Sequence, residues 1–355
     1  MIVHDDKLNL AVIGAGYVAE RIHIPFLKRI PSVNVYALSD IDPDKASIAA
    51  KHRIRIFTQH YKEVLKDENI DVVDICTPPF NHAEIIAEAC DRGKDIIVEK
   101  PMAMTLDEAL AIEGKLRDTR VRLGLVFNMR YSPYLARVLR LVNSGAIGHL
   151  EHILVTSHTF PPEWNKWTDT RWFPEYGALY DFIPHLIDLI LWISQGVPRT
   201  VICRRATNRR DNSYSLIIEL ELPNGTNSTA MISAEWTTST SRRLLYFFGT
   251  NRDLYLDLQD HFAYLTSGYL TPLNRIPILT RRTFSVLRRV ASGGLTRGFM
   301  IYHKLLLEDF IKSFRTGENP RISLQEGIVN TAVIDAAVKS VKQDRQIDIG
   351  IHELP

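Results

Sequence analysis

Apolar and polar positions follow two alternating rhythms in the first part of the chain. Short apolar runs, of the kind expected for strands buried on both faces, recur between segments with helical spacing. One of these helices is predicted to be capped by Asn81 and to end at Gly93, and another opens with a capping box at Thr105–Glu108. The predicted strands are Leu8–Ile13, Val33–Leu38, Arg53–Phe57, Asp71–Ile75, Ile96–Val98 and Arg122–Phe127. Strands and helices that alternate in this way predict a doubly wound parallel sheet, an α/β fold.

After residue 150 the pattern changes to longer strands that follow one another directly. Asn224-Gly225, between two of them, is a strong two-residue hairpin signal. These strands are predicted at Leu150–His158, Thr200–Arg205, Ser213–Leu222, Thr226–Trp236 and Arg242–Gly249. We therefore predict a domain boundary after residue 124. Residues 1–124 would form a Rossmann-type domain, and residues 125–355 an α+β domain with a large, mostly antiparallel open sheet.

The first predicted strand runs directly into a glycine-rich turn. Gly14-Ala15-Gly16-Tyr17-Val18-Ala19 has the pattern G-x-G-x-x-A, in which Gly14 permits a tight turn and Gly16 lets the backbone approach a pyrophosphate. The helix that follows would offer its free N–H groups to that anion. Asp40 ends the second strand, where a carboxylate can accept hydrogen bonds from an adenine ribose. Asp40 could instead cap a helix, but the strand–glycine–helix–strand context favours a dinucleotide site. Because the Asp40 carboxylate would repel a 2′-phosphate and no arginine follows it up to Asp44, we expect NAD rather than NADP.

The stretch Gly93–Pro101 ends a buried strand abruptly at Glu99-Lys100-Pro101. Pro101 cannot extend the hydrogen-bond ladder, so Lys100 lies at the carboxyl end of its strand. Ligands of open parallel sheets bind in the crevice outside these ends. We therefore expect Lys100 to face whatever the sheet binds.

These motifs together resemble the glucose–fructose oxidoreductase/inositol dehydrogenase family, often called Gfo/Idh/MocA. The resemblance rests on the order of Gly14-Ala15-Gly16, Cys76-Thr77-Pro78-Pro79 with His82, and Glu99-Lys100-Pro101. It implies that the proline-containing turn lines the nicotinamide end, that Lys100 contacts substrate and nicotinamide ribose, and that the Lys–Pro bond is cis. The residues predicted to bind NAD are Gly14, Gly16, Tyr17, Val18, Asp40, Thr77, Pro78, Pro79, His82, Glu99 and Lys100.

A second group of chemically active residues lies in a predicted helix that opens at Gly177. Asp181 and His185 are four residues apart, and a carboxylate beside an imidazole suits general-base work on an alcohol. The plain alternative is a polar pair at a helix start; a metal site with Asp188 has little support, because no cysteine or second histidine is close. The block resembles the family's Asp/His helix, except that Ala178 and Ile183 replace glycines.

The predicted catalytic residues are Lys100, Asp181 and His185. Lys100 would stabilise an alkoxide, and His185, oriented by Asp181, would take the hydroxyl proton. Aromatic residues between His158 and Tyr180 suit the apolar face of a sugar, although packing explains such residues equally well. The residues predicted to bind substrate are Lys100, Asn128, Trp167, Arg171, Asp181 and His185, and no metal is expected.

These residues predict an NAD-dependent dehydrogenase or reductase acting on a sugar, cyclitol or nucleotide sugar. Two alternatives stay open: a glycosidase that oxidises its substrate transiently with NAD, and a non-catalytic dinucleotide sensor. A net charge of +2 gives no reason to expect a nucleic-acid partner. The lack of a signal sequence or apolar span, with three scattered cysteines, leads us to expect a cytoplasmic protein. An open sheet commonly pairs with a copy of itself, so a homo-oligomer is expected.

The segment 275–297 is strongly basic. Arg281, Arg282, Arg288 and Arg289 fall on one side of a predicted helix, opposite an apolar side. The plain interpretation is a packed helix with solvated arginines. The alternative is that the segment recognises an anion, such as a diphosphate or an anionic membrane surface.

Overall fold

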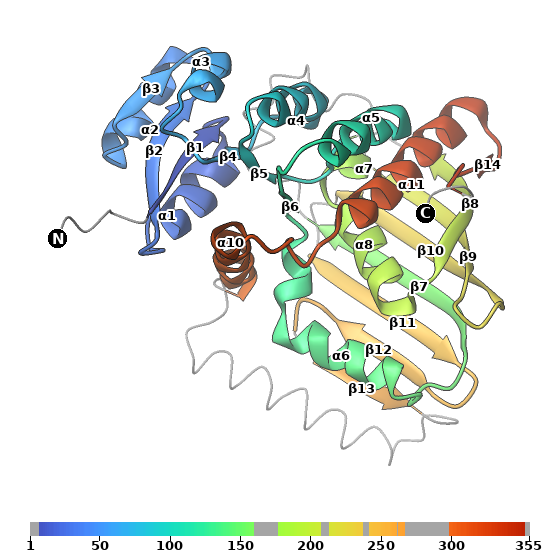
Figure 1. The fold of residues 1–355 in the computed structure, drawn as a ribbon. Helices are drawn as coiled ribbons and strands as arrows, with labels where there is room; N and C mark the ends of the chain where they lie inside the picture. The colour runs from blue at the N-terminus through green and yellow to red at the C-terminus, as the bar shows by residue number, and fades with distance from the viewer. Residues whose placement is uncertain are drawn as a thin grey trace. The chain divides into compact units, whose positions relative to one another are not determined.

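A computed structural model describes residues 7–159, 177–206, 213–236, 241–260, 262–266 and 298–351 (Figure 1). The chain forms two compact units. The first comprises residues 1–131 and 299–331, and the second comprises residues 132–298 and 332–355. Each unit is built around one sheet.

The sheet of the first unit has six parallel strands in the order β3-β2-β1-β4-β5-β6. This order reverses direction between β1 and β4, as in doubly wound dinucleotide-binding folds. The predicted α/β class is therefore confirmed, with every predicted strand present. The strands are β1 (Leu8–Ile13), β2 (Val33–Ser39), β3 (Ile56–Thr58), β4 (Val72–Ile75), β5 (Asp95–Val98) and β6 (Leu123–Leu125).

Helical segments connect these strands. They are η1 (Ala19–His23), α1 (Ile24–Leu27), η2 (Pro43–Lys45), α2 (Ala46–Lys51), α3 (Tyr61–Lys66), η3 (Pro79–Asn81), α4 (His82–Asp91), α5 (Leu106–Arg117) and η4 (Asn128–Tyr131). The capping box is confirmed: Thr105 Oγ1 accepts from Glu108 N at 3.2 Å, and Glu108 Oε2 accepts from Met104 N at 2.8 Å. The predicted side-chain cap by Asn81 is wrong, because α4 continues directly from the η3 turn.

The first unit also takes in a segment from near the end of the chain, which the sequence assigned to the second domain. Helix α10 (Gly298–Thr316) and the start of α11 (Leu324–Gln343) belong to it. A side chain at Gly124 of β6 would put its Cβ 2.7 Å from the Phe310 ring of α10. A Cβ at Gly327 of α11 would lie 2.9 Å from the Leu125 side chain of β6. These glycines let both helices pack directly on β6.

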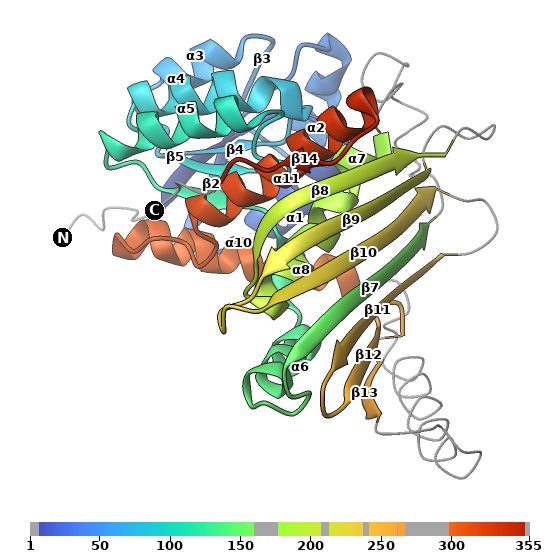
Figure 2. The same cartoon turned by 90° about the vertical axis from the view of Figure 1, so that its right-hand side faces the viewer.

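The second unit contains eight strands in the order β13-β12-β11-β7-β10-β9-β8-β14 (Figure 2). All neighbours are antiparallel except the β7–β10 pair, which confirms the mostly antiparallel sheet. Asn224-Gly225 forms the predicted hairpin turn, with Gly225 at φ 77°. The strands are β7 (Leu150–Thr159), β8 (Val197–Arg205), β9 (Ser213–Glu221), β10 (Asn227–Trp236), β11 (Arg242–Gly249), β12 (Asp253–Asp257), β13 (Phe262–Thr266) and β14 (Ile347–Asp348).

Helices α6 (Pro133–Asn143), α7 (Gly177–Asp181) and α8 (Ile183–Ser194) belong to the second unit, and the last two pack on strands β7, β9 and β10. The predicted single helix through Asp181 and His185 is wrong, because the chain forms α7 and α8 instead. Pro184 lies in the first turn of α8, where its missing N–H and its ring break a continuous helix. The His185 N–H bonds to the Phe182 carbonyl at 3.1 Å.

The face of this sheet away from α7 and α8 carries a row of apolar side chains that crosses seven strands. Ile217 and Met231, which are directly paired, are 39% and 46% exposed. Direct strand partners point to the same face, so the pairing defines the row without further assumption. Its members are Ile202, Ile217, Met231, Leu154, Tyr246, Tyr255 and Tyr264. We call these residues the outer row.

Candidate functional site

The glycine-rich turn of the first unit connects β1 to the helical segment that begins at Ala19. Gly14 has φ 95°, and a Cβ there would lie 2.7 Å from the backbone of Cys76, so only glycine fits. A Cβ at Gly16 would meet no described atom within 4 Å. The turn is therefore closed on the Gly14 side and open at Gly16. This arrangement fits a pyrophosphate placed against the Gly16 backbone.

Asp40 follows β2 and fixes this turn. Its Oδ2 accepts from Ala15 N at 2.6 Å, and its Oδ1 accepts from Asp42 N at 2.9 Å. Tyr17 and Val18 continue the turn, and the Tyr17 side chain is exposed. One carboxylate thus joins the glycine-rich turn to the end of β2, where a ribose is expected in this fold.

His82 connects the two other predicted cofactor-binding turns. Its Nε2 contacts the Thr77 carbonyl at 2.9 Å, and its Nδ1 contacts the Pro101 carbonyl at 2.8 Å. Burial lowers the pKa of His82, although both carbonyls favour the charged ring. A neutral ring can donate to only one of these carbonyls. His82 therefore joins the turn at Pro78 and Pro79 to the Lys100–Pro101 peptide, which is cis as the resemblance implied.

Lys100 and Glu99 follow the last residue of β5 directly. The Glu99 side chain turns inward, and its Oε2 accepts from the Lys100 N–H at 3.1 Å. Glu99 is buried, whereas Lys100 is half-buried. The prediction that Glu99 binds cofactor is not tested by these contacts, which show it instead in a network of the protein's own side chains.

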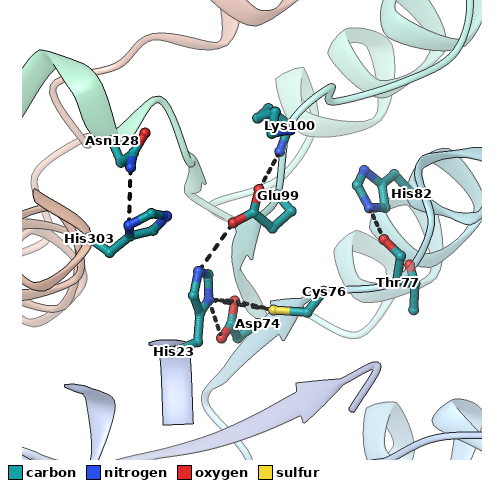
Figure 3. Close-up of polar contacts among 9 residues, drawn as sticks. All are labelled: His23, Asp74, Cys76, Thr77, His82, Glu99, Lys100, Asn128 and His303. Carbon is teal, nitrogen blue, oxygen red and sulfur yellow. Dashed lines mark hydrogen bonds and ion pairs between the residues drawn. The ribbon is translucent and has the colours of Figure 1, made fainter. Parts of the chain in front are cut away.

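This network contains residues that the sequence analysis did not select (Figure 3). His23, at the end of η1, is fully buried; its Nδ1 lies 2.9 and 3.0 Å from the two carboxylate oxygens of Asp74 in β4. The His23 Nε2 forms an ion pair with Glu99 Oε1 at 3.2 Å. On the other side of Glu99, His303 of α10 contacts the Asn128 amide at 3.0 Å. Four segments distant in sequence thus meet around one carboxylate.

The electrostatics of the network follow from its geometry. Burial by itself would lower the pKa of His23, but the Asp74 carboxylate raises it well above its ordinary value. Burial would raise the pKa of Glu99, yet the ion pair with His23, helped by Lys100 and His303, lowers it to about 2. Burial raises the pKa of the neighbouring Cys76 thiol to about 12. At neutral pH the network therefore holds a cationic His23, an ionised Glu99 and a neutral thiol.

One signal for this network was present in the sequence. Asp74 interrupts an otherwise continuous apolar strand, Val72–Ile75, and a buried carboxylate requires a partner. Nothing local indicates His303, because α10 reaches the first unit only through the tertiary fold.

The second unit carries the other predicted catalytic residues. Asp181 ends α7 and His185 lies in the first turn of α8, both half-buried. Burial lowers the pKa of Arg243 on β11, and the Asp181 charge opposes that shift. Trp167, Arg171 and the basic segment 275–297 lie outside the described residues. Asn128, also predicted to bind substrate, is buried and contacts His303.

Comparison with known proteins identifies the family. Residues 8–127 match the model of the GFO/IDH/MocA oxidoreductase family with an NAD-binding Rossmann fold, and residues 135–254 match the GFO/IDH/MocA C-terminal domain. The chain belongs to the GFO/IDH/MocA family, and its cofactor is NAD. The glycine turn described above fits this cofactor.

Individual relatives include sugar and cyclitol dehydrogenases. Inositol 2-dehydrogenase of Rhizobium meliloti is 25% identical over 362 residues, covering 96% of this chain and 99% of that protein. Levoglucosan dehydrogenase of Pseudarthrobacter phenanthrenivorans is 29% identical, but the match covers only 53% of this chain and 51% of the relative. The structure of a levoglucosan dehydrogenase in complex with NADH aligns with a TM-score of 0.75 and 20% identity, covering 97% and 99% of the two chains. No helix in the described ranges is long and apolar enough to cross a membrane.

Proposed function

We propose that the protein is an NAD(H)-dependent oxidoreductase that moves hydride between the nicotinamide and a hydroxyl or keto carbon of a sugar, cyclitol or nucleotide sugar. The observation that carries the proposal is the position of Lys100. It directly follows the carboxyl end of β5, in the same sheet whose first turn is shaped for a pyrophosphate. Ligands of doubly wound sheets bind at these strand ends. The relatives that act on inositol and levoglucosan support a polyhydroxylated substrate.

The residues of the chain would divide the work as follows. NAD, when bound, supplies the hydride acceptor for the carbinol carbon. Lys100 stabilises the alkoxide that develops on the substrate oxygen, since a fixed cation at a partly dehydrated site needs little reorganisation. His185 removes the hydroxyl proton, with Asp181 setting its orientation. In the reduction of a ketone the same residues return the proton.

The direct test is a screen of cyclitols, sugars, anhydrosugars and nucleotide sugars with NAD, following NADH absorbance. We expect turnover with at least one compound class. A reducing sugar released without net NADH would instead indicate the glycosidase alternative. Tight NAD binding without turnover on any class would favour the sensor alternative and overturn the proposal.

A variant of His185 tests the assignment of the base. His185→Ala should reduce kcat by about 10²–10⁴-fold, the usual contribution of a general base. Part of the rate should return at high pH, where hydroxide replaces the missing base. A variant that turns over at the wild-type rate would exclude His185 from this role.

We also propose that the protein works as a homo-oligomer that associates through the outer row of the second sheet. Contiguous apolar side chains on an exposed sheet face are typical of association surfaces. Ile217 and Met231 are neighbours in that row and are its most exposed members. An isologous pairing of two copies would cover both.

A further inference from the structure

Glu99 lies between two histidines that come from opposite ends of the chain (Figure 3). One side-chain atom each of His23, Glu99 and His303 lies within 4.8 Å of the other two. Asp74 holds the far nitrogen of His23, and Asn128 holds the far nitrogen of His303. In this arrangement Asn128 Nδ2 donates to His303 Nδ1, which places the remaining ring N–H of His303 on Nε2. Both imidazoles are therefore fixed with a donor edge toward Glu99.

The two carboxylate oxygens of Glu99 contact different partners. Oε1 meets His23 Nε2 at 3.2 Å, and Oε2 accepts from the main-chain N–H of Lys100 at 3.1 Å. The buried side of the carboxylate is thus attached to the network, and the other side to the backbone of the lysine. Any rotation of Glu99 would break one of these contacts.

We propose that His23 and His303 are positioning residues that hold the Glu99 carboxylate, and through it hold the backbone of Lys100 for catalysis. The proposal rests on the role of Lys100 in the proposed function. His23 supplies a buried positive charge beside the carboxylate, and His303 lies on its other side and helps to keep its pKa low. Without them an ionised Glu99 would be uncompensated in the interior, a costly state that the protein avoids by protonation or by movement.

Among the described residues, the charged and titratable groups in contact with His23 all belong to the first unit. They are Asp74 of β4, Cys76 directly after it, Glu99 beyond β5, and His303 of α10. The two carboxylates require one buried cation, and His23 is the side chain in contact with both. Two histidines and a carboxylate are also a donor set for a divalent cation. The charge state of His23 distinguishes an ion-pair network from a metal site, because a protonated ring nitrogen cannot bind a metal.

The first experiment needs no substrate and is independent of the proposed function. The full-length protein, labelled with ¹⁵N-histidine, is titrated by NMR, and its metal content is measured. We expect both nitrogens of His23 to stay protonated through neutral pH, and Asp74→Asn to remove this behaviour. A His23 that titrates like a free histidine would overturn the proposal, as would a stoichiometric metal ion in the purified protein.

The second experiment measures positioning by kinetics. His23→Gln, whose amide keeps one hydrogen bond to Asp74, should lower kcat by about 10- to 100-fold, because a small misplacement of a reacting group has effects of that size. NAD affinity should change little, since the pyrophosphate turn lies elsewhere. The variant should also lose more activity than the wild type does in mild acid, because Glu99 without its counter-charge accepts a proton there. A purely structural role would not move the pH profile.

A double-mutant cycle completes the test. In a Glu99→Gln background, adding His23→Gln should cost little more, because no charge remains to be held. His303→Gln, on a different helix and only half-buried, repeats the experiment if His23→Gln does not fold. His60→Gln, an exposed histidine of the same unit, is the matched control and should leave kcat and its pH profile unchanged. Fully additive losses in kcat would contradict the proposal and leave the network a role in packing only. An unchanged pH profile in both His23→Gln and His303→Gln would do the same.

Discussion

The two sheets treat polarity in opposite ways. The first sheet holds charges in its interior: His23 and Asp74 are fully buried, and Glu99 nearly so. The second sheet places apolar groups outside, with Met231 and Ile217 on the face away from its helices. Each arrangement is unfavourable for an isolated unit. A buried charge loses its hydration, and an exposed apolar group must be hydrated by water, which is unfavourable for it.

The difference lies in what compensates each sheet. The charges of the first sheet are compensated within the unit, by pairing between η1, β4, β5 and α10. Such pairing fixes geometry more than it adds stability, which suits a site that must place Lys100 accurately. The described residues of the second unit include no element that covers Ile217 and Met231 of the outer row. A second copy of the chain is the partner we propose for it.

The largest expected effect comes from the exposed end of the charged network. Lys100→Ala should reduce kcat by at least about 10³-fold, because it removes the cation that stabilises the developing alkoxide. NAD binding, measured by fluorescence or calorimetry, should stay within a few-fold of wild type. Lys115→Ala, an exposed lysine paired with Asp91 on neighbouring helices, is the control. Loss of NAD binding in the Lys100 variant would show that the lysine acts mainly on the cofactor.

The buried end of the network should act on stability. His23→Leu leaves two carboxylates without their cation and should lower the free energy of unfolding by about 3–5 kcal/mol. Denaturant unfolding monitored by circular dichroism measures this loss. The exposed Lys62–Glu88 pair, broken by Lys62→Met, should change stability little.

The pH dependence of this loss follows from the two pKa shifts. Glu99, lowered from 4.5 to about 2, stabilises the fold above 4.5, and this contribution disappears as pH falls through that interval. His23, raised above 6.5, stabilises fully below 6.5, and its contribution disappears as pH rises through the folded pKa. The difference in the free energy of unfolding between wild type and His23→Leu should therefore be greatest between pH 4.5 and pH 6.5. A difference that grows steadily toward alkaline pH would contradict the charge assignment.

The features that the sequence predicts correctly are those set by residues close together in the chain. Features that depend on contacts between distant residues were missed. The strands of the first sheet, the Gly14 turn and the position of Lys100 are written in local patterns, and the structure confirms them. The break between α7 and α8 is also encoded locally, because Pro184 indicates it. The prediction of one helix gave more weight to the four-residue spacing of Asp181 and His185. The return of α10 to the first unit and the arrival of His303 beside Glu99 depend on tertiary packing at Gly124. No pattern within α10 encodes that contact.

The next prediction concerns the exposed apolar side chains of the second sheet, which form the outer row. Met231→Asp places a charge in the proposed interface and should weaken self-association by at least about 30-fold, the effect expected when a contact residue is a hot spot. Sedimentation or light scattering over a range of concentrations measures it. Met300→Asp is the matched control, because Met300 is similarly exposed but belongs to the first unit. A wild-type protein that is monomeric at all concentrations, or an unaffected Met231 variant, would remove the proposal.

The smallest expected effect concerns cofactor choice. Asp40 places a carboxylate at the end of β2, and Asp42 and Asp44 follow it, so these charges would repel a 2′-phosphate there. The first cation in the sequence after them is Lys45, at the end of η2. We expect NAD to bind more tightly than NADP, and Asp40→Asn to narrow that preference by about tenfold, the effect of removing one nearby unit charge. The amide can still accept from Ala15 N, which keeps the glycine turn in place. Asp44→Asn, whose carboxylate takes no part in fixing that turn, should change the preference less. Equal or tighter binding of NADP by the wild type would show that Asp40 serves only to brace the Gly14–Gly16 turn, and that the cofactor's ribose is read by other residues.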